Sequence, residues 1–361
     1  MTRPKTILIV GAGMAGLMAA QRLKEAGLDV IIVDKGRGVG GRLATRRIEN
    51  ALLDHGAQFF TAKNERFLHE VRQWQALGLV RQWPGDKITE PAQARYIVTG
   101  GMTALAKHFA QKSPVLCNVH IERLVSPAKG SGWTIFDKTG KSYQGDAVIL
   151  TAPVPQIQAL LQHSSLCLTD EAKAHLQDRM VYEPCVALLL TLPEAMGADW
   201  PVFRQAPGYR EFSAGPIRWV ADNTQKGISP NQRSVTVHAA PDFSRAYFDA
   251  LDKSAQGVGD PPDDAQFVQK LLAQLATVSD LSEEMLLQAH WQLKTWRYSQ
   301  AFAKPQDTEQ DAKKNQCAPL FSTGGDALPL LLFAGDAYGG SRVEGAALSG
   351  LAAADALLER L

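Results

Sequence analysis

Apolar residues occur along this chain in two kinds of pattern. The segment 6–10 (TILIV) is continuously apolar and rich in β-branched residues, which is typical of a strand buried on both faces. The segment 17–27 (LMAAQRLKEAG) is a helical stretch that ends at a glycine, and 28–35 (LDVIIVDK) is a second apolar strand. This order of elements predicts a βαβ unit at the start of the chain.

Strand patterns return later. We expect a small meander that leads back to the first sheet, formed by residues 118–124, 132–137 and 142–153. In a second region β-branched and aromatic content predicts strands at 188–192, 216–223 and 234–241. Residues 264–278 (DAQFVQKLLAQLATV) have the spacing of an amphipathic helix. Residues 252–264 and 304–316 are expected to be loops.

The first predicted turn contains the pattern GxGxxG, with Gly11, Gly13 and Gly16 between a strand and a helix. In such a unit the first glycine allows the tight turn, the second lets the backbone approach a pyrophosphate, and the third lets helix and strand pack closely. Asp34 ends the second strand and can accept hydrogen bonds from ribose hydroxyls. The unit predicts a dinucleotide site but does not by itself distinguish FAD from NAD(P).

A second glycine-rich cluster follows at residues 35–47 (KGRGVGGRLATRR). A glycine pair at Gly40 and Gly41 lets the chain pass close to a ligand, and the guanidinium of Arg42 suits a diphosphate. Arg46 and Arg47 are interpreted as a solvated face. Asp54 and His55 are compatible either with acid–base chemistry or with shaping a turn before an apolar segment.

Composition narrows the class of protein. The 361 residues suggest two lobes, and 38 basic against 37 acidic residues argue against a nucleic-acid or anionic-membrane footprint. The four cysteines form no CxxC pair, so we expect reduced thiols in a cytoplasmic protein without a disulfide framework or metal site. No apolar stretch approaches the roughly 18 residues of a membrane helix, and no secretory signal is recognised at the start.

The chain resembles the flavin-containing amine oxidase superfamily, and within it the renalase-like oxidoreductases. The resemblance rests on GAGMAG (11–16), DKGRGVGGR (34–42), DHGAQFF (54–60), YIVTGGMTALAKHFA (96–110), VILTAPVPQ (148–156), KTWRYS (294–299) and AGDAYGGSRVEGAALSG (334–350). Residues 166–319 match more weakly.

The resemblance implies non-covalent FAD, because no cysteine or histidine lies in 334–350. It places the ribityl chain at Asp336, the flavin ring at the backbone around 342–344 and the N-terminus of the last helix, and an adenine contact at Ile121. The cofactor residues expected from the motifs and the resemblance together are Gly11, Gly13, Met14, Ala15, Gly16, Asp34, Lys35, Gly41, Arg42, Gly56, Ala57, Gln58, Phe59, Ile121, Gly335, Asp336, Arg342, Val343, Glu344 and Ala346.

The implied architecture is α/β: a Rossmann-like FAD-binding domain in a p-hydroxybenzoate hydroxylase-like two-domain arrangement, with an α+β substrate domain on a mixed or antiparallel sheet. The expected FAD-binding domain comprises residues 1–62, 96–165 and 326–361, and the substrate domain 63–95 and 166–325. No catalytic group can be assigned. Substrate-side candidates are Trp296 and Tyr298, which share one side of a strand, and Phe60; core packing is an equal alternative for the Trp296–Tyr298 pair. His238 is interpreted as a strand residue rather than a base.

The expected activity is an oxidase that passes hydride from a small planar nitrogen-containing donor to the flavin and then to oxygen, giving hydrogen peroxide. The resemblance to renalases points to a dihydronicotinamide isomer of NAD(P)H as donor. Two alternatives stay open: a flavin amine oxidase or desaturase of the same fold, and a non-catalytic FAD-stabilised interaction protein. The oligomeric state is not predicted.

Overall fold

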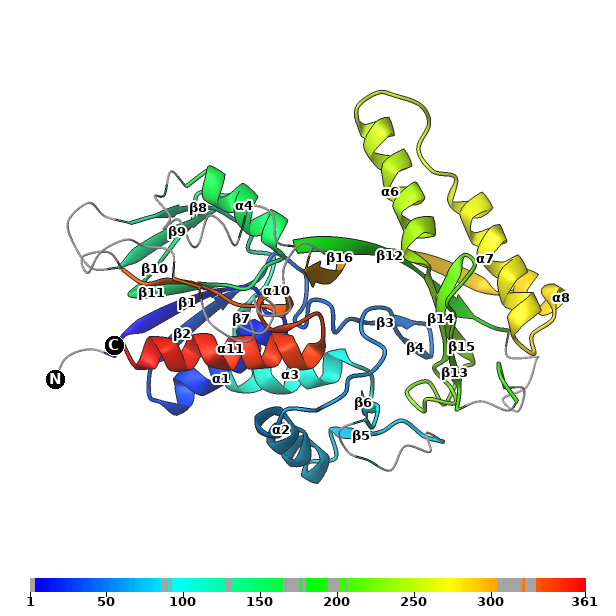
Figure 1. Ribbon diagram of the computed structural model, residues 1–361, viewed down its shortest axis with the longest axis horizontal. Coiled ribbons are helices and arrows are strands. Elements are labelled where there is room, and N and C mark those ends of the chain that lie inside the picture. The colour runs from blue at the N-terminus through cyan, green and yellow to red at the C-terminus, as the bar shows by residue number, and fades with distance from the viewer. Residues whose placement is uncertain are drawn as a thin grey trace.

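Two sheets form the framework of the protein, and the ribbon in Figure 1 shows them at opposite ends of its long axis. The computed structural model describes residues 4–85, 90, 93–126, 132–164, 166, 176, 180–193, 201–204, 207–303, 320–321 and 329–361. No helix within these ranges is both long and apolar enough to cross a membrane.

The first sheet has six strands in the order β17-β18-β11-β1-β2-β7 and contains the predicted βαβ unit. All neighbours are parallel except β17, which runs antiparallel to β18. The strands are β1 (Thr6–Val10), β2 (Asp29–Val33), β7 (Val115–Leu116), β11 (Ala147–Leu150), β17 (Leu320–Phe321) and β18 (Leu331–Phe333). This is the Rossmann-like sheet that the sequence predicts.

Both faces of this sheet are covered, which explains why its strands are apolar without alternation. Ile7 and Ile9 of β1 pack into the helical layer, whereas Leu8 packs into the core on the opposite face. The helical layer contains α1 (Met14–Glu25), α3 (Thr103–Lys112) and α11 (Val343–Leu358). The other face carries β8 (Ile121–Val125), β9 (Trp133–Asp137), β10 (Ser142–Gly145) and α4 (Val154–Gln162). These three strands form the expected meander.

Helix α2 (Glu65–Ala76) belongs by its packing to the first sheet. Its buried Phe67, Val71 and Trp74 share a core with Ile7 of β1. The sequence assigned residues 63–95 to the substrate domain, and this helix does not pack there. The hairpin of β5 (Val80–Gln82) and β6 (Tyr96–Val98) follows, and Trp83 beside it packs against the second sheet.

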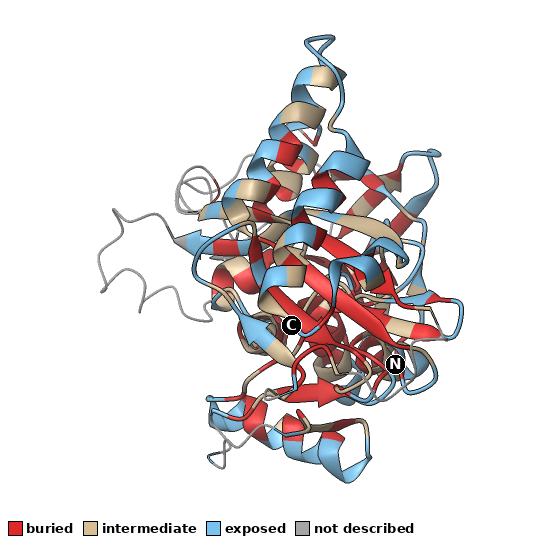
Figure 2. Ribbon diagram, turned by 90° about the vertical axis from the view of Figure 1, so that its right-hand side faces the viewer, coloured by how far each residue is buried: buried red, intermediate tan, exposed pale blue. Residues whose placement is uncertain are grey.

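The second sheet has five strands in the order β13-β14-β15-β12-β16, and every neighbouring pair is antiparallel. The strands are β12 (Met180–Thr191), β13 (Tyr209–Glu211), β14 (Ile217–Asp222), β15 (Ser234–Ala239) and β16 (His290–Ala303). One face, which includes Val186, Leu188 and Val237, packs against α6 (Pro241–Ala255), α7 (Asp264–Val278) and α8 (Glu283–Leu287). Figure 2 shows buried strands beneath these largely exposed helices.

The helix α6 is a correction to the sequence analysis, which predicted no helix there and began a loop at residue 252. Its apolar side chains Tyr247 and Phe248 lie on the face of the helix that packs on the sheet, and exposed side chains lie on the other face. The helix continues through residue 255. Helix α7 has the predicted bounds. The predicted loop 304–316 lies outside the described residues.

Candidate functional site

The first glycine turn is shaped for close approach of a ligand. Gly11 has φ +114°, and a Cβ there would collide with Thr151. A Cβ on Gly16 would collide with the carbonyl oxygen of Gly11, so helix and turn are in direct contact. Within the described ranges, a Cβ on Gly13 would meet no atom within 4 Å, and no side chain caps the α1 N-terminus at this residue. The helix therefore presents free N–H groups to an open space.

The second glycine cluster lies against the first turn. Gly41 has φ +53°, and a Cβ there would lie 3.6 Å from the Cα of Gly13. The amide of Gly40 donates to the carbonyl oxygen of Ala12 at 2.8 Å. Two backbone segments with no side chains between them thus border one space, as a diphosphate requires.

Asp34 orders the segment next to this space. Its carboxylate accepts hydrogen bonds from the amides of Ala12 at 2.7 Å and Gly36 at 2.6 Å. Its carbonyl oxygen accepts from the amide of Val119 at 2.9 Å. The backbone beside the predicted ribose site is therefore that of Val119. Ile121, the residue predicted to offer a backbone contact to the adenine, buries its side chain in a core and pairs with Asp137 in the meander. Its contact with the adenine stays a prediction.

The C-terminal turn reaches the same region from the other edge of the sheet. Gly335 has φ +145° and donates its N–H to Ser349 Oγ at 3.1 Å. Asp336 begins the short helix α10 (Asp336–Gly339) and forms a bidentate ion pair with Arg42, with N–O distances of 2.7 and 2.5 Å. Helix α11 begins after Arg342, whose side chain does not cap it. The α11 N-terminus therefore also has free N–H groups.

These segments fit FAD, whose length requires several separate contacts. The open space at Gly13 and Gly41 suits the diphosphate, and the two uncapped helix N-termini suit its anionic groups. Arg42 connects the glycine cluster to Asp336. The structure brings together the predicted cofactor residues Gly11, Gly13, Met14, Ala15, Gly16, Asp34, Gly41, Arg42, Gly335, Asp336, Arg342, Val343 and Ala346. Lys35 lies nearby and donates to Gln156 at 2.9 Å, while Glu344 accepts from the amides of residues 63 and 64.

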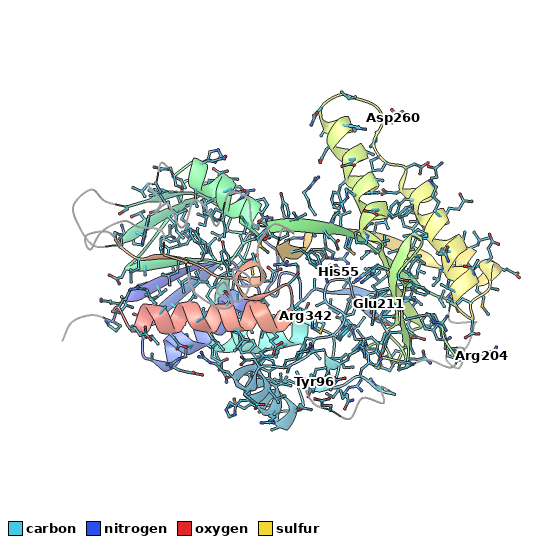
Figure 3. The ribbon with its side chains drawn as sticks, viewed as in Figure 1. His55, Tyr96, Arg204, Glu211, Asp260 and Arg342 are labelled. Carbon is cyan, nitrogen blue, oxygen red and sulfur yellow. The ribbon has the colours of Figure 1, made fainter. Side chains whose placement is uncertain are left out.

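The segment 54–60 crosses the face of the second sheet that α6 and α7 do not cover. It follows β4 (Ala51–Asp54), which pairs with β3 (Thr45–Ile48). His55 contacts Trp296 of β16, Gln58 contacts His238 of β15, and Phe59 contacts Trp219 of β14. Figure 3 shows His55 in the middle of the molecule and Arg342 at the N-terminal end of α11. The β3–β4 hairpin and Trp83 also pack against parts of this face. The face and segment 54–60 together are the candidate substrate surface.

His55 and Trp296 form a flat wall. Their rings stack with centroids 5.3 Å apart at 21°, and the Trp296 indole donates to the His55 carbonyl oxygen at 2.7 Å. Burial and the positive charges of Lys294 and Arg46 lower the pKa of His55 to about 4. The imidazole is therefore neutral near pH 7. Among the residues that the structure describes, its buried Nδ1 has no hydrogen-bond partner.

Gln58 provides a second buried polar atom beside this wall. It is 5 % exposed, and its Nε2 donates to the carbonyl oxygens of Asp54 and Gly56 while lying 3.3 Å from His238 Nε2. Its Oε1 has no hydrogen-bond partner within the described part of the chain. Burial, with the charges of His55 and Lys226, lowers the pKa of His238 to about 4, so this ring is also neutral. His238 is a strand residue as predicted, but it faces the candidate surface.

Phe59 and Phe60 point to opposite sides, as alternating side chains do. Phe59 packs in an aromatic cluster with Trp83 and Trp219. Phe60 is 3 % exposed and packs with Phe67 and other aromatic residues in the core of the first sheet. Phe60 is therefore a core residue, and its prediction as a substrate-side candidate is corrected.

Tyr298 extends the candidate surface toward the cofactor segments. Its ring meets that of Tyr182 edge-on at 5.4 Å, and its carbonyl oxygen accepts from Arg42 at 3.3 Å. Burial, with the negative charge of Asp336, raises the pKa of Tyr182 to about 12, so its hydroxyl keeps its proton. Tyr182 had no signal in the sequence, because its strand carries no motif.

Asp54 has a structural role. It is fully buried and accepts from Thr45 Oγ1 at 2.5 Å, Met102 N at 2.8 Å and Lys226 Nζ at 2.5 Å. Lys226 is also fully buried, at 0 % exposure. This ion pair joins β4 to the second sheet, and it fixes segment 54–60 over that sheet. Asp54 is thus a positioning residue, and nothing in the sequence identified Lys226.

Comparison with known proteins agrees with this geometry. The model of the family described as flavin containing amine oxidoreductase matches residues 82–358, and that of the NAD(P)-binding Rossmann-like domain matches residues 9–74. Mouse renalase is 27% identical over 271 residues, which cover 69% of this chain and 76% of that protein. Putrescine oxidase of Kocuria rosea is 31% identical over 27% of this chain and 21% of its own length.

Solved structures show the same fold. A structure of putrescine oxidase bound to putrescine superposes with a TM-score of 0.70 at 16% identity, covering 100% of both chains. A putative protoporphyrinogen oxidase from an Exiguobacterium species superposes with a TM-score of 0.69 at 12% identity over 100% of both chains. The chain is an FAD-dependent oxidoreductase, which decides against the alternative of a non-catalytic interaction protein. It is a renalase-like protein, and it belongs to the family of flavin-containing amine oxidoreductases.

Proposed function

We propose that this FAD-dependent oxidase takes hydride from a dihydronicotinamide isomer of NAD(P)H and returns NAD(P)⁺. The two electrons and the proton of the hydride pass to oxygen, which takes a second proton from solvent to give hydrogen peroxide. FAD, when bound, supplies the hydride acceptor and the route to oxygen. The residues of the chain bind and orient the donor and keep water from it.

The observation that carries the proposal is the pair of buried unpartnered atoms, His55 Nδ1 and Gln58 Oε1, beside the Trp296 wall. A flat ring bearing a carboxamide offers what these groups lack. Its planar face stacks on an aromatic wall, and its amide has both donors and an acceptor. Leaving such atoms unpaired costs about 1–3 kcal/mol each, so a donor that satisfies both is favoured over one that satisfies neither.

An ordinary amine fits this surface less well, although the family match is compatible with amine oxidation. The charges that act on His55 are those of Lys294 and Arg46, and both are positive. A protonated amine placed there would be repelled. A neutral dihydropyridine ring experiences no such repulsion.

Anaerobic mixing of the yellow holoenzyme with possible donors tests the proposal. The 2- and 6-dihydro isomers of NAD(P)H are expected to bleach the flavin within seconds, whereas ordinary NADH and a panel of amines are not. Trp296→Ala should retain FAD but lower the reduction rate by about 10- to 100-fold, because misplacing a donor by about 1 Å costs that order. Rapid bleaching by amines and none by the isomers would contradict the proposal and favour the amine oxidase alternative.

A further inference from the structure

Strand β16 has a bulge directly after the tryptophan of the His55–Trp296 wall. The two residues that flank Pro184 in β12 pair with Gln300 and Trp296 of β16. Pro184 alone therefore lies opposite residues 297–299, and β16 has more residues than β12 over this stretch. Proline has no N–H to donate to a neighbouring strand, which is why prolines within sheets occur at bulges and edges.

The side chain of Arg42 binds this bulge. Its Nη1 donates to the carbonyl oxygen of Ser299 at 3.1 Å and to that of Tyr298 at 3.3 Å. In a regular strand successive carbonyl groups point in opposite directions, so one donor atom reaches two in a row only where the strand is distorted. The bulge thus turns two carbonyl groups toward Arg42, and a cationic donor makes the stronger kind of hydrogen bond.

The main chain of Arg42 binds the segment that carries the other ring of the wall. Its carbonyl oxygen accepts from the amide of Ala57 at 2.9 Å. A Cβ on Gly56 would collide with the same oxygen, so the two backbones are in direct contact. Arg42 therefore contacts both segments that supply the wall, which provide His55 and Trp296 respectively.

The same guanidinium is fixed on the cofactor side. It forms the bidentate ion pair with Asp336, at the start of α10 in the C-terminal glycine-rich turn. Asp336 is 7 % exposed, and a bidentate pair of this kind has one defined geometry. The planar fork of an arginine can bind the carboxylate and the bulge together, whereas the ammonium of a lysine is a single point charge.

We propose that Arg42 is a positioning residue of the substrate surface, which holds His55 and Trp296 in one place relative to the cofactor segments. This role adds to the contact with a diphosphate that the sequence predicts for Arg42. It goes beyond the proposed function, because it concerns the position of the wall and applies to any donor whose ring lies against it.

Arg42→Lys tests the role, and Arg297→Lys is the matched control. Arg297 lies on the same bulge and also forms a bidentate pair, but with Asp252 of α6 on the covered face of the sheet. The limiting rate of anaerobic flavin reduction is measured in FAD-loaded protein with the 6-dihydro isomer of NAD, or with an amine if only amines reduce the flavin. Arg42→Lys should lower this rate by about 10- to 100-fold, because misplacing reacting groups by about 1 Å costs that order. Arg297→Lys should keep the native rate.

A double variant shows whether Arg42 acts through the wall or through the cofactor. Residues that act through one contact have effects that do not add. Arg42→Lys combined with Trp296→Ala should therefore be little slower than Trp296→Ala alone. Effects that multiply would mean that Arg42 acts through the cofactor, and they would overturn the inference. A native limiting rate in Arg42→Lys would also overturn it, even if that variant is less stable, because the role would then be structural.

Hydrogen exchange needs no donor and separates this inference from the proposed function. In FAD-loaded Arg42→Lys the amides of residues 54–60 and 294–301 should exchange about tenfold faster than in the native protein. Arg297→Lys should leave residues 54–60 unchanged. If no dihydronicotinamide reduces the flavin but this difference is found, the proposed function fails and the positioning role stands. Native exchange of both segments in Arg42→Lys would overturn the inference whatever the donor.

Discussion

The two sheets of this protein use their faces differently. The parallel sheet buries both faces, with Ile7 on one side and Leu8 on the other. The antiparallel sheet buries one face under α6 and α7, and its other face carries His238, Lys294 and Trp296 against segment 54–60. The first sheet is therefore a scaffold whose strand ends lie at the candidate cofactor segments, whereas the second sheet carries side chains of the candidate substrate surface.

The largest expected effect distinguishes, within the first turn, the glycine that borders the cofactor space from the glycine that the fold needs for packing. Gly13→Val should abolish FAD binding, because its side chain occupies the space left for a diphosphate, yet the apoprotein should fold since no protein atom opposes it. Gly16→Val should prevent folding, because its Cβ collides with Gly11. Flavin absorbance and far-UV circular dichroism measure both. A folded, fully yellow Gly13→Val protein would contradict the assignment of the space at Gly13 to the diphosphate of FAD.

The next effect concerns the buried ion pair that joins the two sheets. Lys226→Met should lower the free energy of unfolding by about 3–5 kcal/mol, because it leaves Asp54 charged and without its cation. Arg245→Met is the control, since Arg245 pairs with an exposed Asp242 and should cost under about 1 kcal/mol. Urea denaturation of the holoenzyme gives both values. Equal losses would mean that the pair does not couple the sheets.

A smaller effect follows from the two neutral histidines of the second sheet. His55 and His238 have pKa values lowered to about 4 in the folded protein, against about 6.5 in an unfolded chain. The unfolded state binds more protons between these values, so stability should fall as pH is lowered from about 6.5 toward 4. His238→Gln should reduce this slope, measured as urea midpoints at pH 7, 6 and 5. An unchanged slope would mean that His238 does not contribute to the loss of stability at low pH.

The smallest effect concerns the covered face of the second sheet. Asp263 caps α7 by accepting from the amide of Gln266 at 3.1 Å. Asp263→Ala should cost about 1 kcal/mol of stability and leave flavin reduction unchanged, because α7 lies behind the sheet. Asp260→Ala, in the preceding loop, is the control and should change neither quantity. A slower reduction in Asp263→Ala would show that the two faces are coupled.

The cofactor half of the site could be predicted from sequence because the spacing of glycines indicates where the backbone must turn tightly or come close to another group. Gly11, Gly13 and Gly16 each have the geometry that their spacing indicated. The substrate half could not be predicted to the same extent. Lys226 and Tyr182 carry no local signature, and Phe60 was misplaced because only the packed core shows which of two adjacent phenylalanines faces inward.

The sequence by itself determined the βαβ unit, the three glycine-rich segments and the family resemblance, since these depend on residues close together in the chain. The tertiary structure alone decided which side chains meet on the second sheet. His55 lies 241 residues from Trp296, and Asp54 lies 172 residues from Lys226. Such contacts arise from strand register and burial, which depend on the whole fold.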